Sequence, residues 1–250
     1  MVIAINFSAG NPMVVLNGVL TAVVLSGRLT GAHLNMAVTV GVFLAEDTKK
    51  MKKNIILLII MLLSQFVGAF FGQWIAHTDL TVENIAILKP LSTDYSAWNV
   101  FFIEAMCTFI FVSCVLHNVF PRLSIQSDTV LAVGSICVSL YFAIIVARNY
   151  TGAAINPTFA IANILFVSFV KDSTYVRYLP AYALGTLLGG ILAGIICKYL
   201  VMPVVPHYYD NLLQTYREEI QTKISMLDNL EKTTTNYIPI ILPPMPLIEE

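Results

Sequence analysis

Residues 30–35, TGAHLN, return almost unchanged at residues 151–156 as TGAAIN. Each copy leads into a short apolar segment, 35–45 in the first case and 156–170 in the second. Both segments are too short to cross a bilayer, which takes about 20 apolar residues as a helix. Three longer apolar segments separate the two copies, so the copies would enter a membrane from opposite faces. The sequence therefore predicts an inverted repeat whose two short helices meet near the middle of the bilayer.

The composition places the whole chain in a membrane. Of its 250 residues, 57% are apolar and 12% are charged, whereas roughly 25% of residues are charged in a soluble domain. The apolar residues gather in segments long enough to span a bilayer. We therefore expect an all-α membrane protein with a channel-like domain over 13–200, two half-helices at 35–45 and 156–170, and five spanning helices at 13–28, 55–76, 98–117, 129–147 and 179–200.

Lysine and arginine favour the cytoplasmic side of membrane proteins, and this bias sets the predicted orientation. With residues 30–35 on the cytoplasmic side, ten basic residues lie there and four lie on the far side. Residues 1–12 are then an extracytoplasmic segment and residues 201–250 a cytoplasmic tail. Two triplets on the far side match the N-glycosylation pattern, Asn6-Phe7-Ser8 and Asn149-Tyr150-Thr151.

The tail is expected to be partly helical. Its residues 239–246 hold four prolines and should be extended or disordered. The preceding part has apolar side chains at spacings of three and four, typical of a short amphipathic helix in water or on the membrane surface: Leu213, Tyr216, Ile220, Ile224, Leu227 and Leu230.

Several classes of function are disfavoured. The four cysteines lie inside apolar segments, so we expect no disulfides, and the four histidines are scattered, so we expect no metal site. A net charge of −1 gives no indication of nucleic-acid binding. No nucleophile–base pair is recognisable, so we expect neither an enzyme nor a cofactor.

The chemistry is expected at the asparagines, Asn35 and Asn156, with which the two short helices begin. The first backbone N–H groups of a helix lack partners within it, and the aligned peptide dipoles leave about half a positive charge at that end. An asparagine can satisfy one of these donors while its amide reaches a cavity. Two such ends facing each other would orient the oxygen of a passing water or hydroxyl and repel cations. The plain alternative is that each asparagine only caps its helix; two copies with opposite directions favour the pore.

The chain resembles the aquaporin, or major intrinsic protein, family. Residues 31–39 look like that family's first Asn-Pro-Ala loop and residues 151–158 like its second. The resemblance implies passage of small neutral solutes across a lipid bilayer and a homotetramer with one pore per chain. It assigns pore motifs to Asn35, Met36, Ala37, Asn156, Pro157 and Thr158. It also implies supporting roles for His33 and for Glu104, whose counterpart braces a half-helix loop.

Two departures from the family pattern concern the helices and the motifs. About one span precedes Asn35, whereas the family has two, so a first helix is expected to be missing. Either the sequence is a truncated product or a five-span form borrows a wall from a neighbour. Met36 and Thr158 replace the motif's proline and alanine. We expect the pore to persist with altered packing.

A third departure lies at the narrow selectivity filter. Water-selective relatives place an aromatic residue, a histidine, a small residue and an arginine there. Counting from the motifs maps these positions onto Val15, Ile144, Ala153 and Phe159, all of which are apolar. An apolar filter leaves a desolvated water without polar partners, at a cost of roughly 1–3 kcal/mol for each unmade hydrogen bond. The alternative is that Phe159 merely packs and the count is off by one.

These expectations combine into a passive channel for water or other small neutral solutes, with an atypical apolar filter. The alternative is a non-conducting member of the same family with a structural or regulatory role. The unusual filter and the expected absence of the first helix both favour that alternative.

Overall fold

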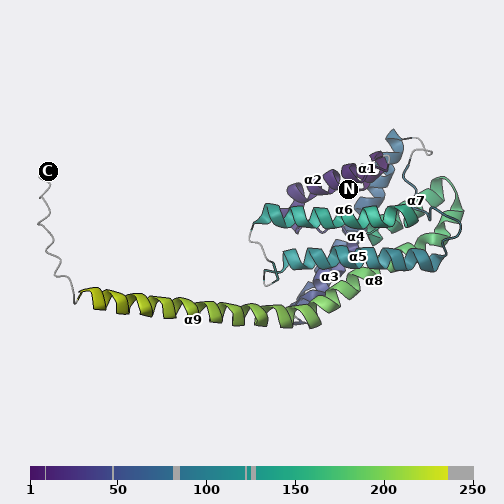
Figure 1. Ribbon diagram of the computed structural model, residues 1–250. Coiled ribbons are helices and arrows are strands. Elements are labelled where there is room, and N and C mark those ends of the chain that lie inside the picture. Colours follow the sequence, from purple (N-terminus) through teal and green to yellow (C-terminus); the bar gives the residue numbers. More distant parts are fainter. Residues whose placement is uncertain (9, 47, 81–84, 122, 125–127, 236–250) are drawn as a thin grey trace, which may run out of the picture. The chain divides into compact units, whose positions relative to one another are not determined.

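The computed structural model in Figure 1 describes residues 1–8, 10–46, 48–80, 85–121, 123–124 and 128–235. Throughout these residues the regular secondary structure is helical. The chain divides into a compact unit over Met1–Pro203 and a second unit over Val204–Glu250. The two units are described separately.

The first unit contains eight α-helices among the described residues. A 3₁₀ segment, Ser173–Tyr178, precedes the last of them, and a π-helical segment, Cys197–Val201, follows it. The α-helices are α1 Val2–Phe7, α2 Pro12–Thr30, α3 Met36–Ala45, α4 Thr48–Asp79, α5 Ala97–Val119, α6 Thr129–Thr151, α7 Pro157–Val170 and α8 Leu179–Ile196.

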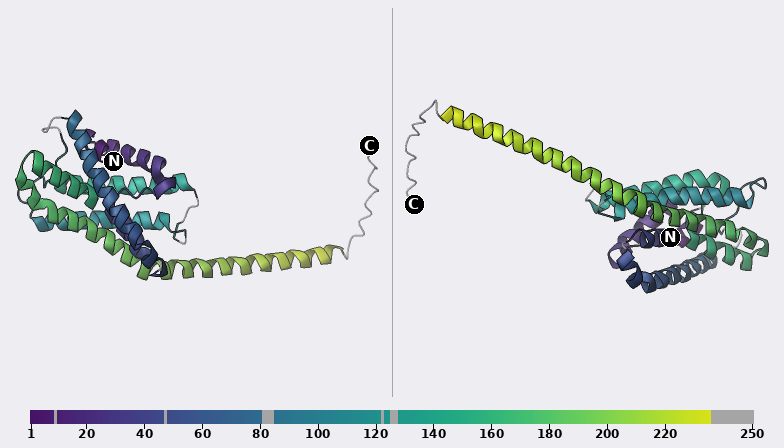
Figure 2. Two further views of the ribbon diagram at one scale, coloured as in Figure 1. Left: turned by 180° about the vertical axis from the view of Figure 1, so that it is seen from behind. Right: turned by 90° about the horizontal axis from the view of Figure 1, so that it is seen from below.

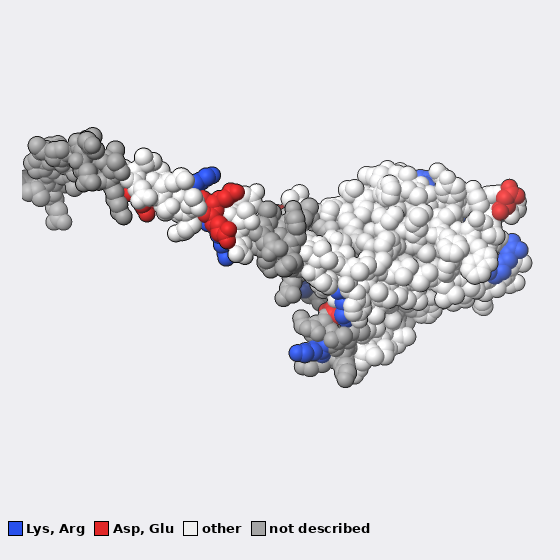
Figure 3. All heavy atoms as spheres, turned by 60° about the horizontal axis from the view of Figure 1, so that its bottom comes forward, with Lys and Arg blue, Asp and Glu red and all other residues white. Residues whose placement is uncertain are grey.

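Five helical segments are long and apolar enough to cross a membrane: Pro12–Thr30, Asn54–Asp79, Ala97–Val119, Thr129–Thr151 and Ser173–Val205. Helices α3 and α7 are apolar but shorter. The expected all-α membrane fold, with five spans and two half-helices, is therefore confirmed. Figure 3 shows a broad face of the first unit that is almost free of charged side chains, as lipid contact requires.

Local signals explain where the long helices begin. Asn11 caps α2 by accepting a hydrogen bond from the backbone of Met13, and Pro12 occupies the first helical position. Ser96 and Asn99 form a reciprocal capping box at the start of α5. Asp128 accepts two backbone hydrogen bonds at the start of α6.

Glycines allow α8 to lie directly against α5 and α3, and the two views in Figure 2 show these helices together. A Cβ atom added to Gly185 would lie 2.6 Å from the carbonyl oxygen of Phe101. A Cβ added to Gly190 would lie 2.5 Å from the carbonyl oxygen of Ala37. Only residues without side chains permit such an approach of two helix backbones, as is common in membranes. Through Gly190, α8 fixes the position of α3 and of the loop that precedes it.

Helix α9, Met202–Thr235, extends over most of the described part of the second unit. The sequence predicted a short amphipathic helix, but α9 is longer because it begins at Met202, well before Leu213. The six apolar side chains singled out from the sequence are exposed along α9. The proline-rich residues 239–246 lie outside the described residues.

Candidate functional site

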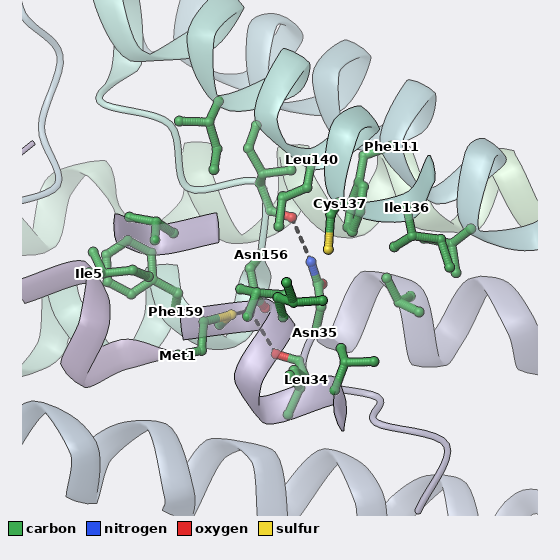
Figure 4. Close-up of a pocket in the computed structure, with 18 of the residues that line it drawn as sticks. Met1, Ile5, Leu34, Asn35, Phe111, Ile136, Cys137, Leu140, Asn156 and Phe159 are labelled. Carbon is green, nitrogen blue, oxygen red and sulfur yellow. Dashed lines mark hydrogen bonds between the residues drawn. The ribbon is translucent and has the colours of Figure 1, made fainter. Parts of the chain in front are cut away.

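The two repeated loops meet through their asparagines. Asn35 caps α3 by accepting from the backbone N–H of Ala37 at 2.8 Å, and Asn156 caps α7 by accepting from that of Thr158 at 2.9 Å. The Nδ2 of Asn35 donates to the carbonyl of Ile155 at 2.8 Å. The Nδ2 of Asn156 donates to the carbonyl of Leu34 at 3.0 Å, and Figure 4 shows both contacts side by side. Each asparagine therefore caps its own helix and also binds the loop of the other repeat.

The two loops adopt related backbone conformations. Gly31 and Gly152 end α2 and α6 in the left-handed conformation, with φ of 73° and 83°. The alanines that follow them, Ala32 and Ala153, also have positive φ. Glycine tolerates this conformation without steric cost, which explains why the repeat keeps a glycine there. In the second loop Ile155 also has positive φ, 49°, which is strained for a β-branched residue.

The two motif substitutions, Met36 and Thr158, contact each other. Met36 occupies the first position of α3, where a proline would carry no N–H. Its N–H donates to the hydroxyl of Thr158 at 3.2 Å. That hydroxyl in turn donates to Oε1 of Gln65 at 3.4 Å. The hydroxyl gained at position 158 thus satisfies the backbone donor gained at position 36.

Glu104 lies inside α5 and is fully buried. Its Oε1 accepts from the hydroxyl of Thr151 at 2.6 Å and from the N–H of Ala154 at 2.9 Å. Its Oε2 accepts from the N–H of Ile155 at 2.8 Å. One side chain therefore satisfies three donors of the second loop, including the strained Ile155. The hydroxyl of Tyr182 adds a hydrogen bond to the carbonyl of Thr151.

A cavity of about 980 Å³ runs past the two asparagines. Its walls include residues of α2 from Pro12 to Arg28 and of α6 from Thr129 to Arg148. Figure 1 shows these two helices side by side with opposite chain directions. The cavity therefore extends along nearly the full length of both helices, with Asn35 and Asn156 on its wall.

All four residues mapped to the filter line this cavity: Val15, Ile144, Ala153 and Phe159. Val15 and Ile144 come from the two long walls, whereas Ala153 and Phe159 come from the second loop and α7. The side chain of Phe159 is only 3% exposed and packs in a cluster that includes Tyr182. Both sequence interpretations of Phe159 thus have a structural counterpart, because it lines the cavity and is also part of the core.

Two arginines that the sequence interpretation did not assign to the site also line the cavity. Arg148 lies one turn beyond Ile144 on α6, and Arg28 lies near the end of α2. Since the two helices run in opposite directions, the arginines mark opposite ends of the cavity. The four-residue spacing from Ile144 is the signal that could have identified Arg148.

His33 lines the cavity beside Asn35. Its Nδ1 is buried, and among the described residues it has no hydrogen-bond partner. Its ring lies next to Gly31, where an added Cβ would be 3.4 Å from Cδ2. His33 thus belongs to the first loop and to the cavity wall, and its supporting role in the pore stays a prediction.

The family model described as Major intrinsic protein matches residues 7–220 of the chain. Aquaporin FA-CHIP of Pelophylax lessonae is 29% identical over 180 residues, which are 71% of this chain and 61% of that protein. Glycerol uptake facilitator protein-like 6 of Lactiplantibacillus plantarum is 27% identical over 177 residues, which are 70% of this chain and 76% of that protein. The chain thus spans less than two thirds of the length of the first of these relatives.

A solved structure has the same fold. The aquaglyceroporin from Plasmodium falciparum matches with a TM-score of 0.60 at 20% sequence identity, over 78% of this chain and 81% of that one. At this level of identity the match speaks for the arrangement of helices and not for the solute.

Proposed function

The chain belongs to the major intrinsic protein family, and on that premise we propose that it is a passive channel for small uncharged solutes. It is an integral membrane protein that crosses the bilayer several times. The proposed route is the cavity between α2 and α6, past Asn35 and Asn156.

The observation that supports this function most directly is the reciprocal contact of Asn35 and Asn156 on the wall of one cavity. Each carboxamide nitrogen carries two N–H donors, and this contact uses one of them. Both asparagines also start helices, whose N-terminal ends carry partial positive charge. Such a wall attracts the oxygen of water or of a hydroxyl compound and repels cations, and Arg28 and Arg148 add positive charge at the two ends.

The apolar filter points to weak selectivity for water. Val15, Ile144 and Phe159 offer a desolvated water no hydrogen-bond partner, so hydrogen bonding there depends on backbone groups near Ala153. Among solutes of similar size, those whose hydration is weaker lose less free energy on desolvation and would pass relatively better than they do in a polar filter.

Proteoliposome swelling tests the proposed function. Vesicles containing the purified chain are subjected to osmotic gradients and to gradients of urea and glycerol, and their light scattering is compared with that of empty vesicles. We expect at least one of the three solutes, water included, to cross faster in the presence of the protein. Rates equal to those of empty vesicles for all three would refute conduction.

Phe159→Ser tests whether Phe159 limits water. The serine removes the ring and supplies a hydroxyl, so water no longer lacks a partner at that point. We expect water permeability to rise at least about fivefold, because an unmade hydrogen bond costs roughly 1–3 kcal/mol and each 1.36 kcal/mol is tenfold in rate. Phe169→Ser is the matched control, since Phe169 is on the same helix, is 90% exposed and does not line the cavity. An equal effect of both substitutions would contradict a role of Phe159 in the route.

A non-conducting member of the family is the second candidate. The near-complete burial of Phe159 favours it, because a side chain fixed in the core narrows the cavity permanently. A silent wild type together with a silent Phe159→Ser variant would support this candidate. Conduction by Phe159→Ser alone would instead indicate an intact route that the ring closes.

The assembly as a homotetramer remains a proposal from the family resemblance. Many large apolar side chains are exposed on α2 and α4, where they can face lipid or a neighbouring copy. The mass of the detergent-solubilised protein, measured by light scattering, distinguishes a tetramer from a single chain.

A further inference from the structure

Helix α1 forms part of the cavity wall, a role that the sequence interpretation did not give it. Met1, Ile5 and Ser8 line the cavity and share one helical face through their spacings of four and three. The neighbouring face, with Val2 and Asn6, is buried. Val2 packs in the same core cluster as Ala69 of α4 and Phe159 of α7. This short helix is therefore held between the body of the protein and the cavity.

A pair of carboxamides anchors α1 to α4. The Nδ2 of Asn6 donates to Oε1 of Gln73 at 3.0 Å, and Nε2 of Gln73 donates back to Oδ1 of Asn6 at 3.2 Å. The backbone N–H of Ala86 also donates to Oδ1 of Asn6, at 3.1 Å. Both side chains are buried, and an unpaired carboxamide in such a place would be costly. Asn6 is thus used inside the fold and is not presented for glycosylation, unlike the expectation from its triplet.

The cavity-facing side of α1 reaches Asn156, one of the two paired asparagines. The Sδ of Met1 lies 3.8 Å from Nδ2 of Asn156, which also donates to the carbonyl of Leu34. Figure 4 shows Met1, Ile5 and Phe159 gathered on one side of Asn156. A thioether is only a weak acceptor, so Met1 lies beside this N–H donor without offering it the hydrogen bond that an oxygen would give.

We propose that α1 is a specificity-determining element that narrows the route beside Asn156. The apolar side chains of Met1 and Ile5 lie with that of Phe159 on the cavity wall beside Asn156. Gly10, which follows α1, lies toward Arg148, because a Cβ added to it would be 3.9 Å from Nη2 of that arginine. The Asn6–Gln73 pair holds α1 in place and so keeps the route narrow beside Asn156. Water can pass such a constriction more easily than a larger solute such as glycerol. This inference rests on the proposed channel function and adds to it a barrier to larger solutes supplied by the first helix.

The test compares glycerol and water permeability of proteoliposomes that contain equal amounts of the full chain or its variants. Ile5→Ala shortens a side chain on the cavity wall, and we expect it to raise the ratio of glycerol to water permeability at least about threefold. Ile3→Ala is the matched control, because Ile3 lies on the same helix, is 41% exposed and does not line the cavity. Asn6→Leu keeps the size of the side chain but removes its pairing with Gln73, and should change the ratio in the same direction.

The outcomes separate this inference from the proposed function. A conducting wild type whose glycerol-to-water ratio is the same in Ile5→Ala and Ile3→Ala would overturn the role of α1 and leave the channel function intact. A silent wild type with a conducting Ile5→Ala would support the narrowing of the route by α1 and overturn conduction by the unaltered chain. Rates no higher than those of empty vesicles for every chain, including Phe159→Ser, would overturn both.

Discussion

Replacing Glu104 by alanine is expected to abolish accumulation of the folded protein in the membrane. The substitution leaves two buried donors without an acceptor, the N–H groups of Ala154 and Ile155, and leaves the hydroxyl of Thr151 only the carbonyl of Ala147, at 3.2 Å. Each buried donor left unpaired costs about 1–3 kcal/mol. For the two N–H groups the sum is roughly 2–6 kcal/mol, a large share of the free energy of unfolding of a typical domain, about 5–15 kcal/mol. The loop would also lose the contact that holds Ile155 at its strained φ of 49°.

Glu104→Gln should lie between the wild type and Glu104→Ala. The amide keeps one oxygen acceptor, so its NH₂ group faces at least one of the loop's donors. We therefore expect the free energy of unfolding to fall by about 1–3 kcal/mol. Yield of monodisperse protein in detergent and the midpoint of thermal unfolding measure both effects. Glu219→Gln, an acid-to-amide change at an exposed position of α9, serves as the control. A Glu104→Gln protein as stable as this control would show that the carboxyl is not needed to hold the loop.

Thr158→Ala should destabilise the protein by about 1–3 kcal/mol, because it removes the acceptor of the Met36 N–H. Adding Met36→Pro to this variant should restore most of the loss, since proline has no N–H at that position. The backbone accepts a proline there: Asn35 has φ −147° and ψ 123°, close to the φ −150° and ψ 113° of Asn156, which already precedes Pro157. The pair of substitutions should therefore be non-additive, with a coupling of about 1–2 kcal/mol.

The measurement is a double-mutant cycle of unfolding free energies in detergent, from the single variants and the double variant. Thr21→Ala is the matched control, because the hydroxyl of Thr21 is exposed and bonds only to a carbonyl of its own helix. If Thr158→Ala costs no more than this control, or if Met36→Pro brings no recovery, the two substitutions do not compensate each other. Water permeability of the double variant would further show whether this contact affects the route.

The meeting of the two loops could be predicted from the sequence. Two copies of one motif, separated by an odd number of spans, leave their short helices few arrangements, because unpaired backbone inside lipid is tolerated only in protein or beside water. The structure brings Asn35 and Asn156 together through two reciprocal hydrogen bonds. The four residues that the sequence assigned to the filter also all line one cavity in the structure. Their role in selecting a solute stays a prediction.

Other features of the site had no sequence signal of comparable strength. Met36 and Thr158 looked like two separate departures from a motif, although they form one hydrogen bond. Helix α1 has six residues, too few for periodicity to show that one face is buried and another lines the cavity. The partner of Asn6, Gln73, lies on another helix, and an Asn-Phe-Ser triplet gives no hint of that contact.

Insertion into a membrane, the number of apolar spans and the asparagine at the start of each short helix followed from the sequence by itself. These are local properties, because lipid requires each segment to satisfy its own backbone and to be long enough to cross. The tertiary structure alone decided which distant groups meet: Glu104 with the second loop, Thr158 with Met36, and α1 with Asn156. Such contacts depend on the depth and rotation at which helices pack, and small residues such as Gly190 set that packing through close approach rather than through any repeating pattern.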